Sequence, residues 1–399
     1  MMDIIKSQRM NSFQQSIFSE LSKRKNSKLS EGADMIDLSI GSPDTPPPSF
    51  ITEMISDLAK DPTMYQYTLK GTDQFHKSVA DNYLRNYDVK INHDTQVALL
   101  MGSQDGLVHL PLVLCDPGDY VLVPDPGYTA YEAGCNLAGA VKYPMPLKKE
   151  NGFLPDLSLI PDEVSEKAKL MIISYPGNPV PVLATEEFFK EAIAFAKKYN
   201  IVLLHDFAYS ELYFETKPIS LLSIEGGMDV GIEMNSLSKS FSMAGCRVAY
   251  AAGNEEVIGL LGSLKSNLDY GVFHPFQMAA AKALMDQSSF LDEMRSNLQK
   301  RRDYLLSGFA DIGWHIDPPQ GSMFIWAEIP KNYTSMEFAF ELLEKAHVVV
   351  TPGSAFGEYG EGFIRMAMVQ PEEILDKAIM QIKNSRMITP HAWTAGSNS

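Results

Sequence analysis

Short runs of apolar residues, rich in leucine and β-branched side chains, alternate along the chain with amphipathic stretches of helix length. Five of these runs predict strands, at residues 97–101, 120–123, 170–174, 201–205 and 247–251. The alternation predicts an α/β fold in which helices cover a parallel sheet. A composition of 45% apolar and 21% charged residues excludes collagen, coiled coil and disorder.

The segment after the third run indicates how the strands are linked. Thr185 is a good helix N-cap, and apolar residues recur at helical spacing over residues 188–195. This helix is expected to join two strands as a βαβ unit. A longer helical pattern covers residues 276–306, and a strand pattern restarts at 323–327. We therefore expect a second, smaller domain to begin near this point.

Charge and cysteine content narrow the choice of partners and compartment. Lys and Arg total 34 against 50 Asp and Glu, and the resulting net charge of −16 disfavours binding to nucleic acid. No signal peptide and no membrane-spanning run is visible. Cys115, Cys135 and Cys246 lack CxxC spacing, which argues against structural zinc and for a reduced compartment. We expect a cytoplasmic protein without a bound metal.

Lys239 lies among hydroxyl side chains in the most informative segment of the chain. Ser236, Ser238 and Ser240 surround it, and Arg247 follows eight residues later. A lysine condenses with an aldehyde only as the free amine, which a nearby cation or an apolar pocket favours by lowering its pKa. The alternative is a surface lysine in a serine-rich turn, and this segment alone does not decide between the two.

Asp206 follows directly on the strand at 201–205, where ligand crevices open in parallel sheets. A carboxylate there could hold the ring nitrogen of a pyridoxal cofactor protonated. The alternative is a helix N-cap. Tyr209, three residues on, could donate to a phenolate oxygen or simply pack.

A glycine-flanked turn at residues 102–106 follows the first strand and opens an apolar helix. Free backbone N–H groups at such a helix start can bind phosphate. Ser103 and Gln104 could add donors, and Ser236 and Arg247 could complete the anion site. A tight turn chosen only for packing remains the alternative.

Three further residues lie where ligand contacts are expected. Tyr128 could stack on a flat cofactor ring, and Asn178 could reach its phenolic oxygen, although both stand in Pro/Gly-rich segments that could be plain turns. Arg365 interrupts an apolar strand-like run. It could clamp a substrate carboxylate, or it could form a buried ion pair.

In this order, these segments resemble the class I/II aminotransferases of fold type I, which use pyridoxal 5′-phosphate, and the resemblance covers almost the whole chain. It implies an α/β fold with a large domain, residues 46–285, whose mostly parallel seven-stranded sheet lies between helices. A smaller α/β domain would combine residues 1–45 with 286–386. Residues 387–399 would form a flexible tail.

The resemblance also assigns roles to single residues. As catalytic residues it implies Lys239, which bonds to the cofactor and shuttles a proton, with Asp206 at the ring nitrogen and Tyr209 at the phenolate oxygen. The other cofactor-binding residues would be Ser103, Gln104, Tyr128, Asn178, Ser236, Ser238 and Arg247. The substrate would contact Gly41, Asn178 and Arg365.

Members of the family are dimers in which a tyrosine of one subunit reaches the phosphate bound by the other. Tyr67 matches that residue, with Tyr65 as a rival because the spacing from Tyr67 to Gly71 is one residue shorter than usual. Two departures from the family pattern are Val180-Pro181, where Thr-Gly is usual, and Cys246, where a bulkier residue is common.

The implied reaction moves an amino group from an L-amino acid to a 2-oxo acid. Residues 125–128 and 349–353 are most similar to the LL-diaminopimelate aminotransferase-like subgroup, so that compound or a related amino acid is the expected substrate. A carbon–sulfur lyase of the same fold is the alternative, because it would share nearly every residue named above.

Overall fold

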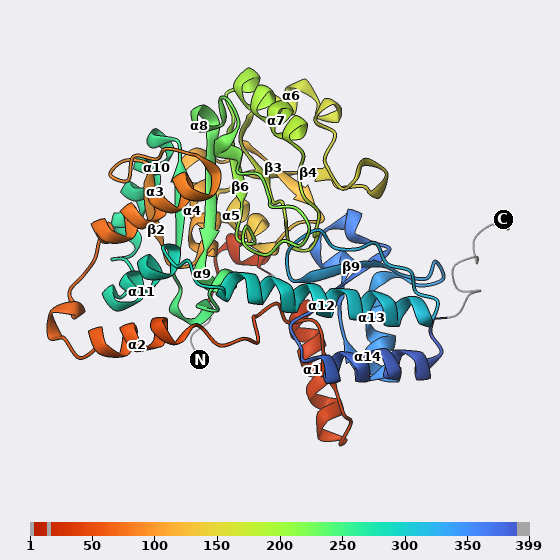
Figure 1. Cartoon of the computed structure of the whole chain (residues 1–399). Helices are drawn as coiled ribbons and strands as arrows, with labels where there is room; N and C mark the ends of the chain where they lie inside the picture. The colour runs from red at the N-terminus through yellow and green to blue at the C-terminus, as the bar shows by residue number, and fades with distance from the viewer. Residues whose placement is uncertain (1–3, 14–16, 389–399) are drawn as a thin grey trace.

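A seven-stranded sheet forms the centre of the computed structural model, which describes residues 4–13 and 17–388 (Figure 1). Its strands follow the order β2-β8-β7-β6-β5-β3-β4. Their bounds are β2 Val97–Leu100, β3 Tyr120–Asp125, β4 Val141–Pro146, β5 Ala168–Ile173, β6 Val202–Asp206, β7 Gly231–Ser236 and β8 Ala249–Gly253. The predicted α/β fold with a mostly parallel sheet of seven strands is confirmed.

Strand β8 is the member of this sheet that runs against its neighbours. It pairs antiparallel with both β7 and β2, whereas β3, β4, β5, β6 and β7 pair in parallel. A parallel crossover normally contains a full helix. The link from β7 to β8 holds only the short helix α9, Leu237–Ser240, and a 3-10 turn, so the strand predicted at 247–251 returns in the opposite direction.

Two strands of the sheet were not among the predicted runs. Strand β4 lies at the edge of the sheet and is largely exposed, so it has no continuous apolar run. Strand β7 is buried throughout, but it carries Glu233 and Asn235. Polar residues inside a buried strand hide the hydrophobic pattern on which the prediction depends.

Helices cover both faces of the sheet (Figure 1). One face packs against α2 Ser49–Leu58, α3 Asp73–Tyr87, α7 Glu186–Tyr199 and α11 His274–Leu284. The other packs against α4 Ser103–Leu114, α5 Thr129–Ala138 and α10 Glu255–Leu268. The short helices α6 Asp162–Ser165 and α8 Gly227–Val230 lie in connections. Helix α7 begins as predicted, with the Thr185 hydroxyl accepting a hydrogen bond from the Phe188 N–H at 3.2 Å.

A second, three-stranded sheet packs with the C-terminal helices around Trp314. It consists of β9 Phe324–Glu328, β11 Thr351–Pro352 and β12 Phe363–Ala367, with α12 Phe290–Asp311, α13 Ser335–Glu341 and α14 Glu372–Ser385 beside it. The helical pattern expected over 276–306 is two helices, α11 and α12, separated at residues 285–289. In this break the Ser288 hydroxyl donates to Asp286 and accepts from the Phe290 N–H, a local pattern that competes with helical hydrogen bonding.

The N-terminal segment joins the C-terminal part of the chain. Helix α1, Ile17–Ser30, leads into β1, Ile36–Asp37, which pairs in parallel with β10, Val348–Val349. Met387 and Ile388, the first residues of the predicted tail, are buried in the core around Trp314, and the rest of that tail lies outside the described residues. The domain bounds at residues 45 and 285 stay a prediction.

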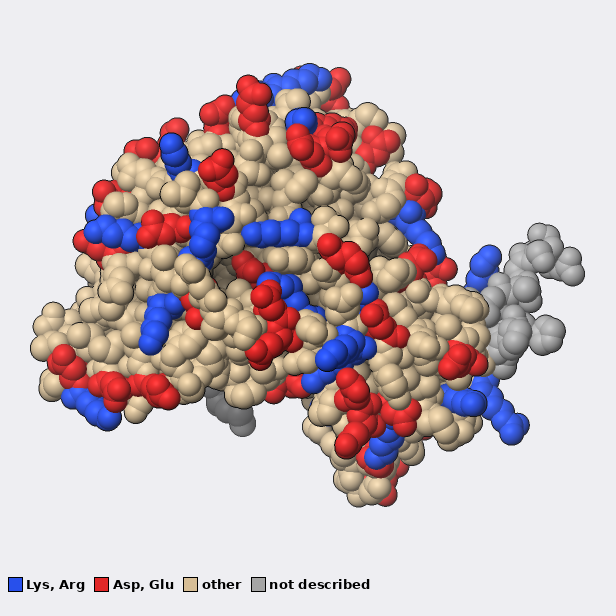
Figure 2. All heavy atoms as spheres, viewed as in Figure 1, with Lys and Arg blue, Asp and Glu red and all other residues tan. Residues whose placement is uncertain are grey.

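The described surface mixes both signs of charge. On the face shown in Figure 2, acidic and basic side chains are interspersed. Within residues 4–13 and 17–388, no helix is long and apolar enough to cross a membrane.

Candidate active site

One cavity of about 430 Å³ collects most of the predicted site residues. The parallel strands β2, β3, β5, β6 and β7 end at one edge of the sheet, and the segments that follow them supply its walls. Segments near β1, β9 and β12 close it from the other side. The predicted residues that line it are Gly41, Ser103, Tyr128, Asn178, Asp206, Tyr209, Lys239 and Arg365.

Lys239 reaches this cavity from the short helix α9. Its Nζ donates a hydrogen bond to the Gly41 carbonyl at 2.5 Å. Burial lowers the pKa of Lys239 to about 8, and the positive charges of Arg365 and Arg247 contribute to the lowering. The surface-lysine alternative is therefore wrong. The environment favours the free amine that covalent chemistry needs.

Asp206 ends strand β6 in a buried position, with 6% of its surface exposed. The Tyr131 hydroxyl donates to its Oδ2 at 2.7 Å, and the Ala208 N–H lies 3.4 Å from its Oδ1. Burial raises the pKa of Asp206, although the Tyr131 bond opposes this. No helix starts after Asp206, so the N-cap alternative is wrong. A cation placed against this carboxylate would stabilise its charged form.

Arg365 lies on strand β12 with 4% of its surface exposed. Its Nη1 donates to the Asn178 side-chain oxygen and its Nη2 to the Ser39 carbonyl, both at 2.6 Å. The guanidinium also lies 4.2 Å from the centre of the Phe324 ring. Burial lowers the pKa of Arg365 to about 10.

Arg365 forms no ion pair with any described carboxylate, which removes the structural alternative. Its Nε is buried and has no hydrogen-bond partner among the described residues. A buried cation with an unused donor fits a carboxylate supplied by a ligand.

The turn before helix α4 and the start of α9 carry the residues that were predicted to bind phosphate. Gly102 adopts a φ of 82°, and a Cβ at this position would overlap the Arg247 guanidinium, so the turn approaches Arg247 closely. Ser236 caps α9 by accepting from the Ser238 N–H at 3.1 Å. The Ser238 hydroxyl is buried without a partner among the described residues. Hydroxyl and guanidinium donors of this kind bind anions, but Ser236, Ser238 and Arg247 do not themselves line the cavity described above.

Arg247 enters this group because β8 is antiparallel. The residue precedes β8, so the reversed strand brings it to the edge where the parallel strands end. Gln104 contacts the cavity only through Tyr128, whose hydroxyl donates to the Gln104 side-chain oxygen at 3.2 Å. Burial raises the pKa of both Tyr128 and Tyr209. Both are therefore neutral hydroxyls that can donate a hydrogen bond.

These residues fit pyridoxal phosphate. The unpartnered Ser238 hydroxyl and Arg247 suit its phosphate, the buried Asp206 suits a protonated ring nitrogen, and the Lys239 amine suits its aldehyde. Among the described residues, no group of His, Cys, Asp and Glu could hold a metal ion.

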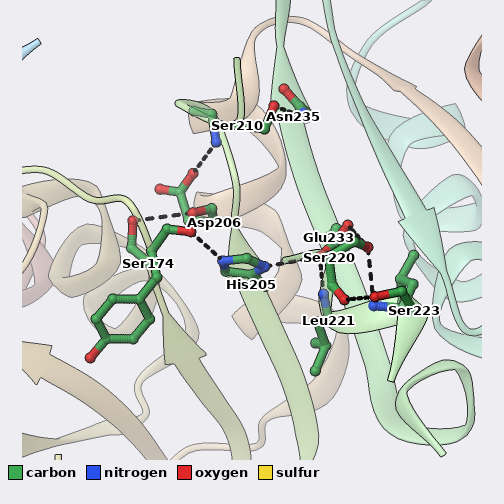
Figure 3. A network of polar contacts seen from close by, with 12 residues as sticks. Ser174, His205, Asp206, Ser210, Ser220, Leu221, Ser223, Glu233 and Asn235 are labelled. Carbon is green, nitrogen blue, oxygen red and sulfur yellow. Dashed lines mark hydrogen bonds and ion pairs between the residues drawn. The ribbon is translucent and has the colours of Figure 1, made fainter. Parts of the chain in front are cut away.

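Strand β6 also carries His205, which we did not assign to the site. Figure 3 shows it between Glu233 and the turn after β5. Its Nδ1 lies 2.9 Å from Glu233 Oε1, and its Nε2 lies 3.1 Å from the Tyr175 carbonyl. Ser174 donates to the Asp206 carbonyl at 3.1 Å. The network therefore joins the turn that carries Asn178 to the strand that carries Asp206.

Glu233 is fully buried and receives donors on both oxygens. Tyr83 and Ser220 donate to Oε2 at 2.8 and 2.9 Å, and the Leu221 N–H donates to Oε1 at 2.6 Å. Each His205 nitrogen also faces an acceptor oxygen, so the ring bridges Glu233 and the Tyr175 carbonyl inside the sheet. The sequence does contain a signal for this pair. His205 and Glu233 each lie within a buried strand, and a buried ionisable residue needs a partner.

Comparison with known proteins agrees with this geometry. The sequence model of the family "Aminotransferase class I and II" matches residues 33–382. The chain belongs to this family. It is a pyridoxal-phosphate-dependent transaminase. Because the family and these relatives are named as aminotransferases, the comparison favours transamination over the lyase alternative.

Several relatives of this aminotransferase match over nearly their full length. An LL-diaminopimelate aminotransferase of Halothermothrix orenii is 41% identical over 92% of this chain and 95% of its own length. The L-glutamine--4-(methylsulfanyl)-2-oxobutanoate aminotransferase of Bacillus subtilis is 41% identical over 93% of this chain and 94% of its own length. Substrate-bound BacF from Bacillus subtilis superposes with a TM-score of 0.92 at 38% identity, covering 96% of this chain and 98% of BacF.

The lowered pKa of Lys239 sets the pH at which the aminotransferase captures its cofactor. Stripped of cofactor and exposed briefly to pyridoxal phosphate, it should be trapped by borohydride with a midpoint near pH 8, because the free amine is the reactive form. Arg365→Met removes a positive charge and should move the midpoint upward. A midpoint near pH 10.5 for the unchanged protein would contradict this environment.

Removal of the Glu233 charge should destabilise the sheet. Glu233→Gln replaces one carboxylate oxygen, which accepts hydrogen bonds from buried donors, by an NH2 group that cannot accept them, and we expect a loss of about 1–3 kcal/mol in unfolding free energy, measured by urea denaturation. Glu186→Gln is the matched control, because it removes the same charge from the exposed pair with Lys190. An equal effect of the two substitutions would show that the buried pair does not stabilise the fold.

Proposed function

We propose that this aminotransferase takes its amino group from LL-diaminopimelate, or from an amino acid of similar shape and charge, and passes it to a 2-oxo acid. The observation that carries the proposal is the joint placement of Lys239, Asp206 and the unpaired Arg365 around one cavity. The names of relatives at about 40% identity support the choice of donor.

The residue roles in this proposal follow from charge and burial. Pyridoxal phosphate supplies an aldehyde that bonds to amines and a ring that accepts the electrons of a broken Cα–H bond. Ser103, Ser236, Ser238 and Arg247 would hold the phosphate, with Gln104 orienting Tyr128. Asp206 would keep the ring nitrogen protonated. Tyr209 and Asn178 would donate hydrogen bonds to the phenolate oxygen.

Lys239 would move the proton at the substrate Cα. With a pKa of about 8, about a tenth of the amine is free at pH 7 and about half at pH 8, and the free amine is still basic enough to accept a proton. Arg365 would bind the α-carboxylate and fix the Cα within reach of Lys239. The Gly41 carbonyl accepts from the lysine in the described structure and would share in orienting the substrate.

We further propose a homodimer in which Tyr67 reaches the phosphate of the neighbouring subunit. Tyr67 is 82% exposed, its ring lies 5.1 Å from that of Tyr270, and its hydroxyl has no partner among the described residues. The Tyr65 hydroxyl instead donates to the Ala59 carbonyl at 2.8 Å. Exposed Leu69 and Tyr270 extend the same apolar surface.

We place the enzyme in the cytoplasm. Cys115, Cys135 and Cys246 are all unpaired, and burial raises the thiol pKa of each, to about 12 for Cys115 and about 11 for Cys135. Such thiols are inert and suit a reducing compartment.

The donor is identified by the half-reaction. Added to the loaded enzyme without a 2-oxo acid, LL-diaminopimelate should shift the long-wavelength cofactor band to that of the amine form, more efficiently than glutamate, methionine or aromatic amino acids. Lys239→Ala should abolish turnover, because no group remains to move the proton. Loss of the band only with another donor would refute the proposed substrate, and release of pyruvate and ammonia from cystathionine would indicate a lyase.

The shared site is tested by mixing two inactive chains. In a heterodimer, the Tyr67→Ala subunit supplies an intact Lys239 and the Lys239→Ala subunit supplies an intact Tyr67. One site can contain both intact residues only if each site takes its tyrosine from the other subunit. Activity should therefore exceed that of either variant alone, at a mass of two 44.3 kDa chains by sedimentation. The same mixture with Tyr65→Ala is the control. No recovery with Tyr67→Ala would place this tyrosine outside the neighbouring site.

A further inference from the structure

A second pair of charged groups lies in the wall of the active-site cavity. Lys25 of α1 and Asp37 of β1 both line it, and Lys25 Nζ lies 2.8 Å from Asp37 Oδ2. The other charged residues of this wall, Lys239, Asp206 and Arg365, already have roles in the proposed reaction. Nothing in those roles uses Lys25 or Asp37.

The pair is fixed relative to the carboxylate clamp. Asp37 Oδ1 accepts from the Ser39 N–H at 2.9 Å and from the Ser39 hydroxyl at 2.6 Å, and the Ser39 carbonyl accepts from Arg365 at 2.6 Å. Asp37 and Arg365 thus contact opposite ends of Ser39, its N–H and its carbonyl. A ligand held by Arg365 at one end would have to extend along Ser39 to reach the pair with its other end.

The lining beside the pair suits such a chain. Leu21, Ile40 and Val349 contribute apolar surface to the same cavity. Methylene groups placed along these side chains would leave water and gain the free energy of apolar burial. A polar group in this stretch would find no matching partner on those three side chains.

Both members of the pair keep unused hydrogen-bonding capacity. An ammonium has three donors and a carboxylate about four acceptor positions. In the described structure Lys25 uses one donor, and Asp37 accepts three bonds. Their side chains are 22% and 18% exposed. Both charged groups are therefore partly open to the cavity, where a ligand can reach them.

We propose that Lys25 and Asp37 form a subsite for the far end of the substrate and select amino acids whose side chain ends in an amino-carboxylate. Lys25 binds the distal carboxylate, and Asp37 binds the distal ammonium. The inference rests on the proposed function, because it assumes that Arg365 holds the α-carboxylate. It deepens that function by assigning the residues that separate LL-diaminopimelate from amino acids with simpler side chains.

The first test compares four donors that differ in the charged groups at the far end, of which L-2-aminoadipate carries its carboxylate one carbon nearer the α-carbon than LL-diaminopimelate does. They are LL-diaminopimelate, L-2-aminoadipate with a distal carboxylate, L-lysine with a distal ammonium, and L-norleucine with neither. Lys25→Met should lower kcat/KM for the first two by about 10- to 100-fold and leave norleucine unchanged, as expected for loss of a hydrogen bond to a charged group. Lys25→Glu should favour lysine over aminoadipate.

Lys23→Met is the matched control, because Lys23 lies on the same helix, is exposed and does not line the cavity. It should change none of the four values. An equal loss on all donors in Lys25→Met would show that the lysine only supports the wall, and no loss on any donor would show that it contacts no substrate. Either result overturns the subsite.

A binding measurement without turnover separates the subsite from the proposed donor. Pimelate carries a carboxylate at each end and heptanoate only one, so Lys25→Met should raise the calorimetric Kd of pimelate while leaving that of heptanoate unchanged. If the enzyme prefers another donor but Lys25→Met still weakens the binding of pimelate and not of heptanoate, the proposed donor is wrong and the proposed subsite is supported. If the enzyme prefers L-glutamine and Lys25→Met abolishes that preference, the subsite binds a carboxamide and not an amino-carboxylate. This result would overturn the proposal.

Discussion

The hydrogen bonds of the His205 ring are the interaction on which the geometry of the site depends. One ring nitrogen faces Glu233 of the next strand, and the other faces the carbonyl of Tyr175 in the turn after the preceding strand. Through these contacts the strand that ends in Asp206 is tied to the turn that carries Asn178 and to the strand that leads to Lys239. Three segments far apart in sequence thereby present their side chains at fixed relative positions.

The site itself is a set of buried charges without full compensation. Desolvation shifts the pKa of Lys239 and Arg365 downward and that of Asp206 upward, so the charged form of each is less favourable here than in water. Such an arrangement costs folding free energy. It becomes favourable when ligand groups of opposite charge enter, which couples cofactor and substrate binding to stability.

The sequence was most informative at the ends of strands. Asp206, Asn178 and Ser103 each follow a recognisable buried run or its turn, and parallel strands bring such positions to one edge. Lys239 was found instead from the serine residues around it, because the strand before it was not predicted. The roles of these residues remain proposals, whereas their convergence on one cavity is observed.

Other features depend on contacts that a linear pattern does not contain. Tyr131 bonds to Asp206 across 75 positions, and Arg365 bonds to Ser39 across 326. The reversal of β8 was likewise hidden, since an apolar run has no direction. The parallel strands also give the sheet two different edges, one where they end at the cavity and one where they begin. The second edge, where α7 is followed by β6 at Asn200, lies about 20 Å of extended chain away from Asp206, so a tag or an inserted domain placed there would leave the chemistry undisturbed.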